Sequence, residues 1–93
     1  MKGNGSILLV DVREPFEYDI ARIEGATLMP LRELPASVEE ISREKDIVVM
    51  CKSGARSAKA AEFLRQAGFE RVFNLTGGID AWADQIDPEM VKY

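Results

Sequence analysis

Two short, uninterrupted apolar runs constrain the fold of this chain more than any other feature. The first, Ile7–Asp11, ends in an acid, and the second, Ile47–Met50, leads directly into Cys51. Because apolar residues do not alternate with polar ones in either run, each is typical of a strand buried on both faces. Strands of this kind belong to parallel sheets that helices cover on both sides.

Helical patterns separate these runs from two weaker strand candidates, Thr27–Met29 and Arg71–Asn74. Strands that alternate with helices predict an α/β fold of three layers, with a small parallel sheet flanked by helices. The paired glycines Gly77-Gly78 predict a tight turn into a last helix that contains Trp82. The other predicted helices are Pro15–Ala21, Leu31–Ser42 with a break at Pro35, and Ser57–Ala67, which Gly68 ends.

Length and charge limit what this fold can do. The chain has 93 residues, of which 46% are hydrophobic, so we expect a single domain over residues 1–93. Its net charge of −4 disfavours nucleic acid and anionic membranes as partners. No stretch approaches the roughly 18 apolar residues of a membrane span, and Met1–Ser6 lacks the pattern of a signal peptide. We therefore expect a cytoplasmic protein.

Cys51 is the only cysteine, and the chain has no histidine. An internal disulfide, a Cys/His zinc site and catalysis by a Ser-His-Asp or Cys-His arrangement are therefore excluded within this chain. We expect no metal and no cofactor. A reactive thiol here must be activated by something other than a histidine.

The loop Cys51–Ser57 provides such activation because it joins a buried strand to the first turn of a helix. Backbone N–H groups at a helix start have no partner within the helix and can converge on one anion. Gly54 permits backbone angles that turn successive amides inward. Ser53 and Ser57 add hydroxyl groups, and Ser57 is a candidate helix cap.

Two cations, Lys52 and Arg56, flank the thiol in this loop. A cysteine pKa of about 8.5 falls to roughly 3.5–7.5 beside cations or a helix start, so we expect Cys51 to be a nucleophilic thiolate. The alternative is an inert, buried cysteine, but such a residue does not require a glycine, two cations and a helix start next to it. The predicted substrate-binding residues are Lys52, Ser53, Gly54, Ala55, Arg56, Ser57 and Arg13.

Arg13 is the member of this set that lies outside the loop. It follows the first predicted strand together with Asp11 and Glu14, and strands in parallel order bring their carboxyl ends to one edge. Charges at a strand end usually serve structure. Contact between Arg13 and the Cys51 loop is the alternative.

This loop resembles the active loop of the rhodanese family, in which four residues separate a cysteine from an arginine or similar residue. Related tyrosine phosphatases have five residues there, whereas only Lys52 to Ala55 intervene here, which suits a persulfide sulfur better than a phosphate. The resemblance continues in the same order along nearly the whole chain. The further matching segments are Leu9–Glu14, Ile23–Ala26 and Gly77–Trp82.

The resemblance implies a sulfurtransferase that carries sulfane sulfur as a persulfide on Cys51. The segment from Trp82 to Tyr93 is similar to the tail of one subgroup, the rhodanese domain fused behind an adenylyltransferase of molybdopterin and thiamin sulfur transfer. The implied donors are thiosulfate or a cysteine desulfurase. The implied acceptor is a ubiquitin-like sulfur carrier protein, activated by an adenylyltransferase domain in cis or in trans.

The chain departs from the family pattern at two places. Arg22–Ala26 stands where the family often has His-Ile-Pro-Gly-Ala. Family domains usually carry another strand and helix before the strand that corresponds to Ile7–Asp11, whereas this chain has Met1–Ser6 at that place. We therefore expect either a trimmed fragment or a minimal domain with an open sheet edge.

Two other functions fit the same residues. A rhodanese fold can serve as a non-catalytic interaction module, although an intact Cys51 loop argues against it. A small phosphatase or arsenate reductase shares the cysteine, the anion loop and the arginine, and the short loop disfavours it.

Overall fold

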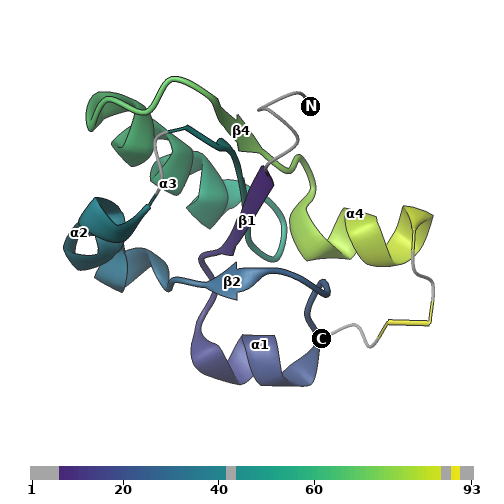
Figure 1. Ribbon diagram of the computed structural model, residues 1–93. Coiled ribbons are helices and arrows are strands. Elements are labelled where there is room, and N and C mark those ends of the chain that lie inside the picture. Colours follow the sequence, from purple (N-terminus) through teal and green to yellow (C-terminus); the bar gives the residue numbers. More distant parts are fainter. Residues whose placement is uncertain (1–6, 42–43, 87–88, 91–93) are drawn as a thin grey trace.

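A four-stranded parallel sheet forms the centre of the protein (Figure 1). The computed structural model describes residues 7–41, 44–86 and 89–90, and the strand order is β2-β1-β3-β4. The elements in chain order are β1 Ile7–Asp11, α1 Pro15–Ile20, β2 Thr27–Leu28, η2 Leu31–Glu33, α2 Leu34–Ser37, η3 Val38–Glu40, β3 Asp46–Met50, α3 Ala55–Gln66, β4 Val72–Asn74 and α4 Gly78–Gln85.

Helices cover the sheet on both faces, which confirms the predicted α/β fold. On one face, α2 and α3 pack against a core that includes Val10, Ile47 and Val49 (Figure 1). On the other face, Ile79 of α4 packs with Met50 at the carboxyl end of β3. No helix in the described part of the chain is long and apolar enough to cross a membrane.

The strand register brings the functional loops to one edge of the sheet. Asp11 of β1 is paired with Met50 of β3, and Val49 of β3 is paired with Asn74 of β4. Because all strands run parallel, the segments that follow β1, β3 and β4 leave the sheet on the same side. Cys51 therefore lies between the carboxyl ends of the two neighbouring strands.

All four predicted strands are present, but two helical predictions and one strand prediction need correction. In the described part of the Leu31–Ser42 pattern, residues 31–41, the chain forms three short segments. Pro35 lies in the first turn of α2, which begins at Leu34, because the first turn of a helix tolerates proline. Helix α3 begins at Ala55 after Gly54, so Ser57 lies within its first turn and is not its cap. Strand β1 is buried only toward its carboxyl end, and Ile7 is exposed.

Arg13 joins β1 to α1 from a fully buried position. Its guanidinium donates to both carboxylate oxygens of Asp11, with a shortest distance of 2.7 Å, and to the backbone carbonyl of Ala21 at 2.6 Å. It also donates to the carbonyl of Glu17 at 3.4 Å. A buried charge requires such a set of partners, since burial without them would be very unfavourable. This arrangement favours a structural role for Arg13 over contact with substrate.

We predict that Arg13→Ala destabilises the fold by about 3–5 kcal/mol, because it leaves the Asp11 carboxylate buried without its partner. Urea unfolding measures the change. The matched control is Arg32→Ala, which removes an exposed arginine that pairs with Glu14 and Glu33; its cost is expected to be below about 1 kcal/mol. Equal losses in the two variants would contradict a structural role for the buried pair.

Candidate active site

The Cys51 sulfur is surrounded by hydrogen-bond donors of its own loop. The residue is 1% exposed, and its Sγ accepts the backbone N–H of Gly54 at 3.0 Å and that of Ser57 at 3.4 Å. The Ser57 hydroxyl lies 3.4 Å from the same sulfur. These groups form the anion-binding loop that the sequence predicts, with the sulfur atom in the place of the anion.

Gly54 allows the loop to close in this way. Its φ of 112° lies in the region that residues with a Cβ rarely adopt, and α3 begins at the next residue. The carbonyl of Gly54 accepts the Ala58 N–H at 3.0 Å, which forms the first helical turn. The same residue therefore turns its own N–H toward Cys51 and starts the helix.

Helix α4 holds the beginning of the loop from the other side. The N–H of Ile79 donates to the Cys51 carbonyl at 2.8 Å, and the N–H of Asp80 donates to the Lys52 carbonyl at 3.0 Å. A methyl group at Gly78 would overlap both carbonyl oxygens, so only glycine fits this close approach. Gly77-Gly78 thus makes the predicted turn and also brings α4 against the active loop.

Hydrogen bonds favour the anionic form of Cys51. Burial has the largest single effect on the thiol and by itself raises its pKa, because it disfavours the charged form. Hydrogen bonds have the opposite effect, and together they lower the pKa of Cys51 below its usual value. The largest of these effects comes from the Ser57 hydroxyl, and smaller ones come from the backbone N–H groups of Ser57, Gly54 and Ser53. The sequence analysis expected the loop cations and the amides at the helix start to act together, and the hydrogen bonds of the loop are the effects that lower this pKa.

Asn74 is a contributor to the site that the sequence analysis did not identify. Its Oδ1 accepts the Ser57 hydroxyl at 2.5 Å, and its Nδ2 donates to the Gly54 carbonyl at 3.4 Å. Because the Ser57 hydroxyl carries one hydrogen, Asn74 Oδ1 and the Cys51 sulfur compete for it, and Asn74 holds the Ser57 side chain beside the sulfur. Its position at the end of a predicted strand next to the Cys51 strand was the signal that could have identified it.

The two loop cations are both paired with carboxylates. The Arg56 guanidinium donates to the two oxygens of Glu17 at 2.6 and 2.8 Å, and Glu17 is itself buried. The Lys52 ammonium lies 3.1 and 3.2 Å from the oxygens of Asp80. The sequence analysis singled out neither acid, because they lie 39 and 28 positions away from their partners.

The remaining predicted residues occupy different places. Ser53 and Ala55 are exposed on the surface of the loop, whereas Arg13 is enclosed by its pairing with Asp11. Among the predicted substrate-binding residues, Gly54 and Ser57 hydrogen-bond to the Cys51 sulfur, whereas Arg13 is paired with Asp11.

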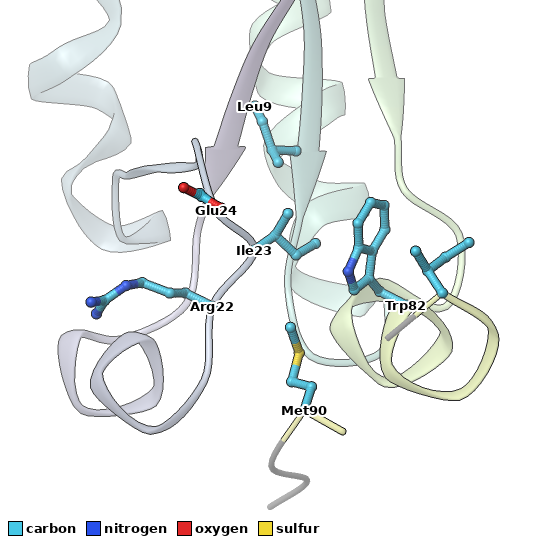
Figure 2. A pocket seen from close by; sticks show the side chains of 7 residues that line it. Leu9, Arg22, Ile23, Glu24, Trp82 and Met90 are labelled. Carbon is cyan, nitrogen blue, oxygen red and sulfur yellow. The ribbon is translucent and has the colours of Figure 1, made fainter. Parts of the chain in front are cut away.

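A cavity of about 580 Å³ lies apart from this loop (Figure 2). Figure 2 shows Trp82 and Ile23 directed toward one another across it, with Met90 below and Leu9 of β1 above. Its lining residues are Leu9, Arg22, Ile23, Glu24, Trp82, Ile86 and Met90. Cys51 is not among them, so the cavity is separate from the Cys51 sulfur.

The fold and the loop define a class of protein: a parallel α/β domain that presents a lone cysteine within an anion-binding loop. Residues 1–85 match the model of the rhodanese-like domain. This chain belongs to the rhodanese-like domain family.

Individual relatives agree with this assignment. A sulfurtransferase of Allochromatium vinosum is 46% identical over 77 residues, which cover 83% of this chain and 72% of that protein. The "Probable adenylyltransferase/sulfurtransferase MoeZ" of Mycobacterium tuberculosis is 42% identical over 89 residues, which cover 94% of this chain and 23% of that protein. This chain therefore spans about a quarter of MoeZ.

The fold also matches a solved structure. A rhodanese-related protein from Thermoplasma volcanium superposes with a TM-score of 0.82 at 34% sequence identity, covering 91% of this chain and 84% of that one. The resemblance that the sequence motifs indicated is thus confirmed at the level of family and fold.

We predict that Ser57→Ala raises the pKa of Cys51, because it removes the hydrogen bond with the largest lowering effect. Because its pKa is lowered, the wild-type Cys51 thiol ionises at a lower pH than an ordinary cysteine thiol. The alkylation rate of the variant should therefore rise at a higher pH than that of the wild type. A pH profile of iodoacetamide alkylation measures this shift. Ser53→Ala, in the exposed part of the loop, is the control, and an equal shift in that variant would contradict the role of Ser57.

Proposed function

We propose that this domain carries sulfane sulfur as a persulfide on Cys51 and passes it to an acceptor. The observation that supports this proposal most directly is the hydrogen bonding of Sγ by Gly54, Ser57 and the Ser57 hydroxyl, which lowers the pKa of the thiol. The similarity to proteins named sulfurtransferases supports the same chemistry. Thiolates are the nucleophiles of sulfur exchange.

The transfer is a displacement at sulfur. The Cys51 thiolate attacks the outer sulfur of the donor, a new bond forms between Sγ and that sulfur, and the old sulfur–sulfur bond breaks. With thiosulfate, the electron pair of the broken bond leaves with sulfite, and a persulfide anion remains on Cys51. Because the amides already point at the sulfur, they stabilise this anion without reorganisation.

The acceptor that we propose is a ubiquitin-like sulfur carrier whose C-terminal carboxylate has been adenylated. The outer sulfur of the persulfide would attack the acyl-adenylate, releasing AMP and forming an acyl disulfide with Cys51. A thiolate from outside this chain, in which Cys51 is the only cysteine, would then attack Sγ, so that the S–S bond breaks and the carrier leaves as a thiocarboxylate. A second external thiol would reduce the disulfide left on Cys51. The similarity to MoeZ, a protein named as both adenylyltransferase and sulfurtransferase, supports this choice. The ATP-dependent activation would come from an adenylyltransferase domain in cis or in trans.

We predict that the protein gains the mass of one sulfur atom from a sulfane-sulfur donor and that Cys51→Ser gains none, since Cys51 is the only cysteine. Mass spectrometry of the intact protein, with thiosulfate and cysteine persulfide as donors, measures this uptake. If neither donor loads the wild type, the sulfur-carrier function is wrong and an interaction module becomes the better explanation. Turnover of a generic phosphate ester would instead support a phosphatase.

A second prediction concerns the acceptor. Loaded protein should lose its sulfur faster to an adenylated carrier than to cyanide, because the proposed role requires delivery to an acyl-adenylate. The measurement compares sulfur loss with a carrier protein, its adenylating enzyme and ATP against loss with cyanide, and the control omits ATP. Equal rates with carrier and cyanide would remove the pathway assignment and leave the persulfide chemistry intact.

A further inference from the structure

The charges around the active loop cancel in pairs. Arg56 is bound through two hydrogen bonds to Glu17, whose side chain is 6% exposed, and Lys52 lies between the two oxygens of Asp80. Arg13, which donates to the backbone carbonyl of Glu17, is paired in the same way with Asp11. These three cations and three carboxylates sum to zero, so ionised Cys51 gives this group of residues a charge of about −1.

The pairing of Lys52 with Asp80 is built into the fold. Asp80 lies in the first turn of α4, and its own N–H donates to the Lys52 carbonyl at 3.0 Å. The preceding residue donates to the Cys51 carbonyl, and Gly78 permits this close approach. The backbone of α4 therefore fixes the Asp80 carboxylate beside the one loop residue whose charge it cancels.

This charge balance bears on the choice of sulfur donor. Thiosulfate brings two negative charges to the thiolate, and the sulfite that leaves is also a dianion. Two like charges a few ångströms apart repel by about 1 kcal/mol even at the dielectric constant of water, and the repulsion doubles for a dianion. A thiol persulfide brings at most one negative charge at its reacting end, so the same loop repels it less.

We propose that Asp80 and Glu17 are specificity-determining residues that cancel the cationic charge of the loop and thereby select thiol persulfides over thiosulfate as donors. The inference rests on the proposed sulfur-carrier function and names the donor class for it. In this step the Cys51 thiolate attacks the terminal sulfur of R–S–SH. A bond forms between Sγ and that sulfur, the sulfur–sulfur bond of R–S–SH breaks, its electron pair leaves on the thiolate RS⁻, and the proton stays on the transferred sulfur.

Asp80→Asn tests this inference with little risk to the fold, because Lys52 and Asp80 are each 35% exposed. Glu17 is less suitable, since its carboxylate also accepts the Glu14 N–H in the cap of α1. The experiment measures the rate at which Cys51 gains sulfur, by intact mass, from thiosulfate and separately from freshly prepared cysteine persulfide. The matched control is Asp84→Asn, which removes one negative charge from the same helix one turn further on.

The wild type should load faster from cysteine persulfide than from thiosulfate. Asp80→Asn should raise the thiosulfate rate about three- to tenfold at low ionic strength, with a smaller effect on the persulfide rate and a smaller gain at high salt. Asp84→Asn should change the ratio of the two rates by less than about twofold, because screening weakens the effect of a more distant charge.

Lys52→Ala separates charge selection from a structural role of the pair. Either substitution breaks the same ion pair, so a structural role would move donor preference in the same direction in both variants. Charge selection requires opposite directions: Lys52→Ala should lower the thiosulfate rate relative to the persulfide rate. An unchanged ratio in Asp80→Asn, or a shift in the same direction as in Lys52→Ala, would overturn the inference while sulfur loading itself still stood.

Discussion

The contact between the first turn of α4 and the beginning of the Cys51 loop is the interaction on which the site depends. Two N–H groups of α4 bind the carbonyls of Cys51 and Lys52, and this leaves the N–H groups of the following loop residues directed toward Sγ. In a trans peptide group the C=O and the N–H lie in one plane and point in opposite directions. Holding the Lys52 carbonyl from outside therefore directs the Ser53 N–H, which shares that peptide group, toward the sulfur.

The sequence was a good guide wherever a feature is local. The strands were predictable because Ile7–Asp11 and Ile47–Met50 are continuous apolar runs, and burial of both faces needs no knowledge of distant residues. The anion-binding loop was predictable for the same reason, since Cys51, Gly54 and the helix start are neighbours in sequence. The role of Ser57 was harder, because the helix start depends on the backbone angle that Gly54 adopts.

The distant partners of the loop could not be read from the sequence. Glu17 reaches Arg56 from α1, and Asp80 reaches Lys52 from α4, so each pairing depends on how separate elements pack around the sheet. Acidic residues are common in this chain, and nothing in their sequence context distinguishes these two from solvated ones. Their effect is that a loop which is cationic in sequence is neutral in the folded protein.

The deep position of Cys51 also has a consequence for oxidation. A disulfide between two copies of the protein would require their sulfur atoms to approach to about 2 Å, in a narrow range of dihedral angles. With 1% of Cys51 exposed and no second cysteine in the chain, the folded loop sterically prevents that approach. Two folded copies of the protein are therefore kept from cross-linking through Cys51.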